Sequence, residues 1–144
     1  MSKITMSESE REEFLAALHV GVIAAERDGD RAPLAVPIWY TYSPGGEVMV
    51  WTERGTVKER LIRASGRFSL CAQQEAPPYR YVSVEGPATF QDDVTADDVR
   101  PLVHRYLPDA EAEAFIGESF NDKAVLIRML PERWFTVDYG KLES

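Results

Sequence analysis

Hydrophobic and polar positions alternate along most of the chain in short runs, which clusters of Gly, Pro, Asp and Ser separate. Runs of this length that are rich in β-branched and aromatic residues predict β-strands. Seven runs fit this description: 21–27, 33–42, 47–52, 67–73, 81–91, 123–129 and 134–138. Asp28-Gly29-Asp30 joins the first two and is a strong hairpin signal. Pro37 lies inside the second run and marks an edge or a bulge, because proline cannot donate to a sheet ladder.

Four other stretches have the periodicity or the end signals of helices. The first, 7–18, opens with Ser7 or Ser9 as its N-cap and carries one apolar stripe. The others are predicted over 57–65, 95–107 and 109–120. Thr56 is the expected N-cap of the second helix, and Gly66 ends it.

The order of these elements predicts the fold class. Strands that follow one another through short turns pair antiparallel, and a sheet of this size removes its edges by closing into a barrel. A doubly wound parallel sheet would need helices between most strands, and the first three strands have none between them. We therefore expect one domain over residues 1–144, mainly β (α+β): an antiparallel barrel of six or seven strands with two to four short helices.

Composition and charge narrow the partners of the chain. With 144 residues, 44% of them hydrophobic, it can bury a core as one domain. Its net charge of −8 provides no positive field for nucleic acid. The N-terminus lacks the apolar region of a signal peptide, no apolar run can span a membrane, and Cys71 is the one cysteine. We expect a cytoplasmic protein with no nucleic-acid and no membrane partner.

The common catalytic constellations are missing from the sequence. It has no Gly-x-Ser-x-Gly elbow, no phosphate-binding P-loop and no complete Gly-x-Gly-x-x-Gly fingerprint. His19 and His104 lie far apart in the sequence, and each is interpreted as an ordinary histidine. Cys71 lies in an apolar strand and is interpreted as packing material rather than a nucleophile. Metal catalysis and covalent hydrolysis are disfavoured, and we assign no catalytic residue and no metal ligand.

One segment of this acidic chain carries a surplus of positive charge. Five basic residues fall within fourteen positions: Arg54, Lys58, Arg60, Arg63 and Arg67. A strand here runs into a turn and then into the helix that starts after Thr56, where free N–H groups favour an anion. The Thr56 hydroxyl could donate to that anion, and Trp51 and Thr52 could contact a planar ring. A capped helix with a solvated basic face explains the same residues equally well.

Six segments, in order, carry a resemblance to a known superfamily: 6–15, 20–29, 33–40, 46–52, 56–70 and 81–90. The most telling is Thr56-Val-Lys-Glu-Arg-Leu-Ile-Arg-Ala-Ser-Gly-Arg-Phe-Ser-Leu. Together they resemble the pyridoxamine 5′-phosphate oxidase-like, FMN-binding split-barrel superfamily. Within it, the chain looks most like the small deazaflavin (coenzyme F420)-dependent reductases. The match covers about residues 6–92 and is looser in the closing strands.

The resemblance implies a split barrel and a cofactor site. The helix start Thr56, Val57 and Lys58 would hold the cofactor phosphate, with Arg60 as a helper. Two further groups would line the cofactor ring: Val36, Pro37, Ile38 and Trp39 at its face, and Val50, Trp51 and Thr52 at its edge.

The same resemblance implies an oxidoreductase that transfers a hydride between F420 and a small planar or conjugated organic substrate. Three alternatives stay open. The same fold could use FMN or FAD, could bind a flavin or deazaflavin without turnover, or could act through dimerisation with no cofactor. If the protein is an F420- or flavin-dependent oxidoreductase, the cofactor supplies the hydride chemistry, which agrees with the absence of a catalytic constellation from the sequence.

We also expect a homodimer with the cofactor site at the subunit interface. A packed barrel of this length has no interior room for a three-ring cofactor, and a second subunit can supply the missing wall. The sequence offers aromatic side chains for that contact: Trp39, Tyr40, Trp51, Tyr79, Tyr81 and Trp134. The alternative is a monomer in which these aromatics cap the ends of the barrel.

Overall fold

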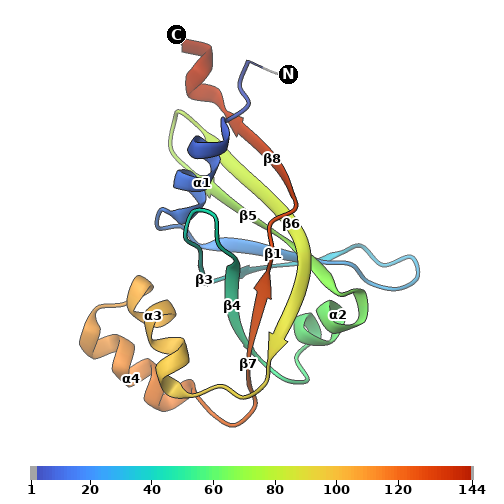
Figure 1. Cartoon of the computed structure of the whole chain (residues 1–144), viewed down its shortest axis with the longest axis vertical. Helices are drawn as coiled ribbons and strands as arrows, with labels where there is room; N and C mark the ends of the chain where they lie inside the picture. Colours follow the sequence, from blue (N-terminus) through green and yellow to red (C-terminus); the bar gives the residue numbers. More distant parts are fainter. Residues whose placement is uncertain (1–2, 144) are drawn as a thin grey trace.

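The computed structural model describes residues 3–143 (Figure 1). Within them the elements have these bounds: α1 (Glu8–Ala16), β1 (Gly21–Ala25), β2 (Leu34–Ile38), β3 (Tyr40–Thr41), β4 (Val48–Glu53), α2 (Val57–Ser65), β5 (Arg67–Gln74), β6 (Arg80–Gln91), α3 (Ala96–Tyr106), α4 (Asp109–Ser119), β7 (Ala124–Met129), β8 (Arg133–Asp138) and the 3₁₀ helix η1 (Tyr139–Glu143). Every predicted helix and strand forms, with its ends within two residues of the expected ones. Only η1 was not predicted.

Every strand pair within residues 3–143 is antiparallel. The strand order is β2-β1-β5-β6-β7-β4-β3, and β8 pairs with β6 off this path. The long strand β6 joins the two parts of the sheet, because residues 80–87 pair with β5 and residues 88–91 pair with β7. The sheet therefore curls into an open barrel (Figure 1), and the predicted fold class is confirmed.

The sheet has eight strands rather than six or seven, because the run 33–42 is interrupted. Trp39 separates β2 from the two-residue strand β3. A side chain from α3 lies at this break. The Tyr106 hydroxyl accepts the N–H of Tyr40 (3.2 Å) and donates to the carbonyl of His19 (2.6 Å). No local pattern in 33–42 indicates this long-range contact.

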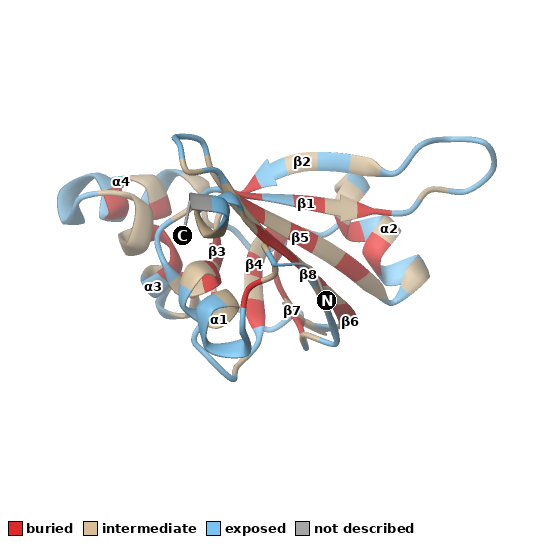
Figure 2. Ribbon diagram, turned by 90° about the horizontal axis from the view of Figure 1, so that it is seen from above, coloured by how far each residue is buried: buried red, intermediate tan, exposed pale blue. Residues whose placement is uncertain are grey.

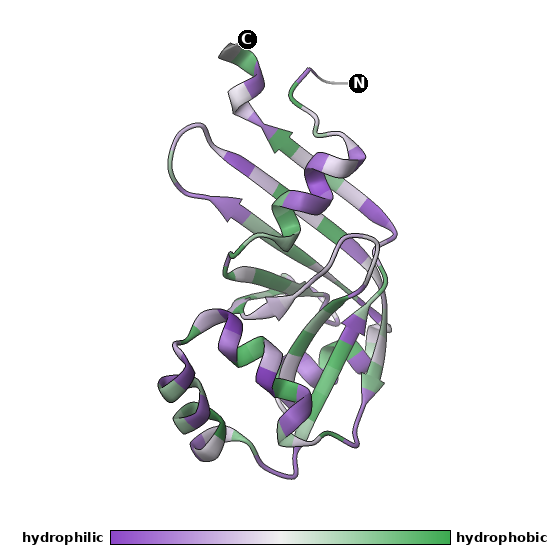
Figure 3. Cartoon of the chain, turned by 60° about the vertical axis from the view of Figure 1, so that its left-hand side comes forward, coloured by the Kyte–Doolittle hydropathy of each residue, from purple (hydrophilic) through white to green (hydrophobic). Residues whose placement is uncertain are grey.

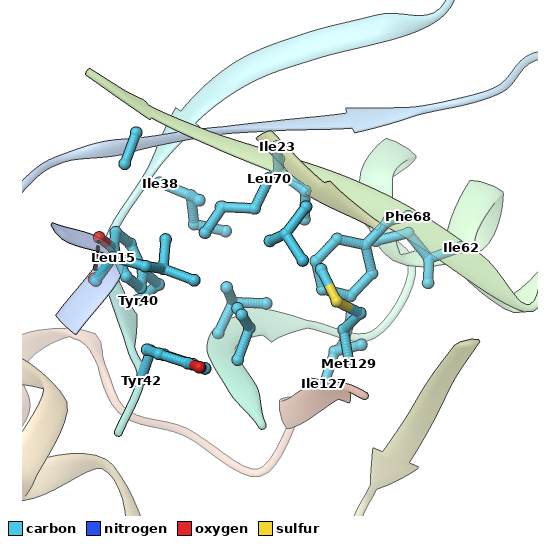
Figure 4. Close-up of a cluster of buried hydrophobic side chains, with 14 of the residues drawn as sticks. Leu15, Ile23, Ile38, Tyr40, Tyr42, Ile62, Phe68, Leu70, Ile127 and Met129 are labelled. Carbon is cyan, nitrogen blue, oxygen red and sulfur yellow. Dashed lines mark hydrogen bonds between the residues drawn. The ribbon is translucent and has the colours of Figure 1, made fainter. Parts of the chain in front are cut away.

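The main hydrophobic core fills the interior of the curled sheet (Figure 4). Buried positions alternate with half-buried ones along β4, β5 and most of β6 (Figure 2). Fully buried side chains such as Leu70 and Ile127 each contribute roughly 1.5–3 kcal/mol. Tyr40 is also fully buried, and its hydroxyl donates to the carbonyl of Leu15 at 2.6 Å. The expectation that Tyr40 contacts a second subunit is therefore wrong, because its side chain has no exposed surface.

A smaller core lies between the sheet and the hairpin of helices α3 and α4, which is inserted between β6 and β7 (Figure 1). Its fully buried members include Val99 and Val103 from α3, Ala112 from α4 and Leu126 from β7. The half-buried aromatic residues Trp39, Trp51, Phe115 and Phe120 pack against it. This core therefore places α4 next to β4.

Local signals explain where the helices begin and end. Ser7 is the N-cap of α1, because its hydroxyl accepts the N–H of Glu10 (3.2 Å) and the Glu10 carboxylate accepts the N–H of Ser7 (2.7 Å). α2 ends at Gly66, whose φ of 76° suits glycine. Across residues 3–143, none of the helices combines the length and the apolar character needed to cross a membrane.

A charged cluster on the α3–α4 hairpin makes its stability depend on pH. His104 contacts Glu113 through Nε2 (2.6 Å) and Asp109 through Nδ1 (2.9 Å). The hydrogen bond to Glu113, and to a smaller extent the one to Asp109, raises the pKa of His104 above its usual 6.5. With a raised pKa, the stabilisation is fully present below about pH 6.5 and is lost as the pH rises through the folded-state value.

We therefore expect the free energy of unfolding of the wild type to fall as the pH rises from about 6.5 through the raised pKa of His104. His104→Gln should remove this part of the pH dependence, as urea unfolding at a series of pH values would measure. Burial lowers the pKa of His19, so His19 titrates on the acid side of this window. A His104→Gln variant that keeps the wild-type slope would contradict the assignment.

Candidate functional site

The turn between β4 and α2 is fixed by side-chain hydrogen bonds. The N–H of Gly55, which has a φ of 88°, donates to the buried carboxylate of Glu59 (2.9 Å). The Thr56 hydroxyl donates to the carbonyl of Glu53 (2.8 Å) and so accepts the hydroxyl of Thr52 (3.2 Å). Because the Thr56 proton is used inside the turn, the expectation that it donates to a bound anion is corrected. Thr56 shapes the turn instead.

The start of α2 still presents backbone donors. The first helical hydrogen bond of α2 runs from the N–H of Arg60 to the carbonyl of Thr56 (3.0 Å), and no side chain caps the N-terminus of the helix. The N–H groups of residues 57–59 therefore have no acceptor among residues 3–143. Free N–H groups and the positive end of the helix dipole together favour an anion.

Ion pairs divide the basic residues of the sequence cluster into two groups. Three of them are paired with carboxylates of the chain: Arg54, Arg63 and Arg67. Lys58 and Arg60 make no ion pair or side-chain hydrogen bond in the part of the chain that the structure describes. Both lie at the start of α2, beside the free N–H groups. The uncompensated positive charge of the segment is therefore concentrated at this helix start.

An open hollow of about 280 Å³ lies beside this helix start. Seven residues line it: Trp51, Thr52, Glu53, Thr56, Lys58, Phe115 and Ser119. The rings of Trp51 and Phe115 meet edge to face, with 6.1 Å between centroids and 88° between planes, and form an apolar wall. A molecule with an anionic group at the helix start can therefore place a planar group against this wall.

Sequence reasoning missed three of the lining residues: Glu53, Phe115 and Ser119. Phe115 and Ser119 come from α4, far along the chain, and Asn121 just after this helix donates to the Glu53 carboxylate at 2.8 Å. Hydrophobic and hydrophilic segments alternate along α3 and α4 (Figure 3), but only α3 gathers its apolar residues on one side. For α4 the sequence therefore indicates no packing side. It does not indicate that the partner of α4 is the end of β4.

The structure brings together part of the predicted cofactor site. Trp51, Thr52, Thr56 and Lys58 line the hollow. Val57 and Arg60 are exposed at the same helix start without lining it. The strand end, the turn and the first helical turn predicted from 50–60 therefore form one continuous surface.

Two predicted ring-contacting residues point elsewhere. Val50 is fully buried in the main core, because it faces the opposite side of β4 from Trp51. The Val50 side chain therefore does not reach the candidate site, and its predicted contact with the cofactor ring is wrong within one chain. Trp39 stacks on Tyr106, with 4.9 Å between centroids and 4° between planes, and lies 5.5 Å from the Phe115 ring. It supports the wall of the hollow from behind rather than lining it.

The remaining predicted residues lie on β2 and do not line the hollow either. Ile38 is buried in the main core, and Val36 packs against that core. Pro37 is exposed, directly opposite Val22 of β1. Within one chain, β2 therefore offers a second surface, separate from the one at α2.

Comparison with known proteins finds this architecture elsewhere. No protein-family model and no curated protein matches the chain. Among solved structures, a conserved hypothetical protein from Mycobacterium tuberculosis is similar with a TM-score of 0.80 and 24% identity, over 100% of this chain and 92% of its own. An F420 reductase has a TM-score of 0.68 and 22% identity, and the match covers 86% of this chain and 94% of the reductase. A FAD-binding protein from Mesorhizobium loti has a TM-score of 0.66 and 23% identity, and the match covers 92% of this chain and 94% of that protein.

Pyridoxamine 5′-phosphate oxidase-like proteins are among the same matches. The chain has their split-barrel fold. In this split barrel, the donors at the start of α2 fit a phosphate, and the Trp51–Phe115 wall fits the flat face or edge of a ring. The residues present therefore fit a cofactor that combines a planar ring system with an anionic tail.

Proposed function

We propose that this split-barrel protein is an oxidoreductase that transfers a hydride between F420 and a small planar or conjugated organic substrate. The observation that carries the proposal is the hollow at α2, where the unpaired side chain of Lys58 and the free N–H groups lie beside an aromatic wall. The likeness of the fold to an F420 reductase supports this cofactor. The likeness to a FAD-binding protein supports the alternative, a flavin-dependent enzyme of the same fold.

Each part of the site has its own task in this proposal. Lys58, Arg60 and the N–H groups of residues 57–59 hold the phosphate. Trp51 and Phe115 orient the ring and exclude water from one side of it. When bound, the deazaflavin or flavin supplies the hydride chemistry. The residues of the chain bind, orient and exclude water, so the proposal needs no catalytic side chain.

Absorbance titrations of the purified protein with F420, FMN and FAD test the cofactor. We expect F420 to bind most tightly. Tighter binding of FMN or FAD would move the proposal to the alternative cofactor, and binding of none would overturn a redox function. Oxidation of the reduced cofactor in the presence of enones or tetrapyrroles, measured against samples without an acceptor, then separates an enzyme from a protein that only binds.

We also propose that the working unit is a homodimer with two cofactor sites between the subunits. The hollow is open, whereas good ligand sites bury about 70–90% of the ligand, so a second wall is needed. The outer face of the sheet offers a row of side chains in register across five strands: Pro37, Val22, Cys71, Ser83 and Phe135. A largely apolar row of this kind suits a self-complementary contact between two copies.

Light scattering at micromolar concentration checks the dimer. We expect twice the mass of the 16.2 kDa chain, and a monomer after Phe135→Glu, because an unpaired carboxylate buried in an interface is costly. Leu18→Glu is the matched control, since Leu18 is 63% exposed and Phe135 65%, but Leu18 lies outside the row. A monomer mass for the wild type with cofactor bound would rule out a shared site.

A further inference from the structure

A second cavity, of about 390 Å³, shares no residue with the hollow at α2. It lies between α1 and the ends of β5, β6 and β8, and Gln74 and Arg80 are among its lining residues. In Figure 1, α1 and α2 lie at different ends of the sheet. The volume is within the range of small-molecule pockets, roughly 300–1,000 Å³. The proposed redox function gives this cavity no task.

The charged groups around the cavity do not cancel. Glu10 is paired with the Lys141 ammonium at 2.7 Å, and Asp138 with the Arg80 guanidinium at 3.4 Å. Glu13 has no hydrogen bond or ion pair for its carboxylate within residues 3–143. Among the residues that line the cavity, Glu13 therefore carries an uncompensated negative charge, on the side that α1 forms. Arg105 makes no ion pair within residues 3–143 and lies near His19, where it donates to the carbonyl of Ala17 at 2.7 Å.

One wall of the cavity is a stacked ring pair. The rings of Phe14 and His19 lie 4.4 Å apart between centroids, with 24° between planes. His19 is neutral near pH 7, because burial lowers its pKa.

The Glu13 carboxylate and the ring pair favour an organic cation over other ligands. The unpaired Glu13 carboxylate disfavours an anion beside it, and the ring pair offers a flat surface to an apolar body and attraction to a cation. A metal ion is disfavoured, since no group of three or more His, Cys, Asp or Glu side chains in residues 3–143 is arranged to hold one. We propose that this cavity binds a small organic ammonium ion, with the ammonium group at Glu13 and the apolar body against Phe14 and His19.

Three probes of nearly the same shape test the charge that the cavity prefers. Benzylamine, benzyl alcohol and sodium benzoate are titrated into the wild-type protein, and backbone amide shifts are followed by NMR. We expect benzylamine to bind most tightly and to shift the amides of His19 and Gln74, which line the cavity. Glu13→Gln should weaken benzylamine binding by about fivefold, as expected for a partly solvated ion pair. This variant should fold normally, because the Glu13 side chain is exposed.

The control for Glu13→Gln is Glu8→Gln, an exposed carboxylate on the same helix that does not line the cavity. It should leave benzylamine binding within about twofold of the wild type. Benzyl alcohol or benzoate binding as tightly as benzylamine would overturn the proposal. So would equal affinities of the wild type and Glu13→Gln for benzylamine. Both results are independent of whether F420 or a flavin binds at α2.

Discussion

Replacing Lys58 with alanine should weaken the binding of a phosphate-bearing cofactor by about tenfold or more. Hydrogen bonds to charged groups contribute about 1.5–3 kcal/mol, and about 1.4 kcal/mol corresponds to a factor of ten. Lys58 lines the hollow and has no partner within residues 3–143, so its full charge is available to a ligand. The fold should survive, because the side chain lies on the surface of a helix. The absorbance titration gives the affinity, and urea unfolding gives the stability.

A matched control comes from the same basic segment. Arg67 is paired with Glu132 at 3.2 Å and does not line the hollow, so Arg67→Ala should leave cofactor affinity unchanged. Thr56→Ser should also keep the affinity, since the hydroxyl that bonds the Glu53 carbonyl remains. If Lys58→Ala bound the cofactor as tightly as the wild type, the phosphate would have to lie elsewhere. The split-barrel fold would stand in that case.

The fold could be predicted from the sequence because its determinants are local. The period-two pattern along 67–73 and 81–91 gives strands whose alternate residues are buried, and Asp28-Gly29-Asp30 joins two strands as expected. The break at Trp39 could not be predicted, because its cause is the Tyr106 hydroxyl from α3. Contacts between residues this far apart leave no periodic signal in the sequence.

The same difference between local and long-range contacts explains which residues of the candidate site could be predicted. Trp51, Thr52 and Lys58 line one hollow, because one strand, one turn and one helix start hold them together. Their contact with a cofactor stays a prediction. Phe115 was missed, because it reaches the hollow through the packing of an inserted hairpin. Val50 was assigned by its position next to Trp51, but side chains on a strand alternate between faces, and Val50 faces the core.

Replacing Gly86 with alanine should destabilise the protein by about 4 kcal/mol or more, an unusually large effect for one methyl group. A Cβ atom on Gly86 would lie 1.8 Å from the carbonyl oxygen of Leu130, which is backbone and cannot rotate away. Hydrogen bonds on both sides hold that backbone in place: Leu130 N–H to the Pro87 carbonyl (3.1 Å) and Glu132 N–H to the Glu85 carbonyl (2.9 Å). Urea unfolding measures the loss. Domains are stable by only about 5–15 kcal/mol, so the variant should be marginal.

Gly117→Ala is the control, because it adds the same methyl group where there is room. Gly117 lies within α4, and a Cβ atom there would have no neighbour within 4 Å. Alanine favours a helix over glycine by about 1 kcal/mol, so this variant should be as stable as the wild type or more so. If Gly86→Ala unfolded within about 1 kcal/mol of the wild type, the turn between β7 and β8 would have to move away from β6 at little cost. The close contact at Gly86 would then not determine the point on β6 at which its pairing changes from β5 to β7.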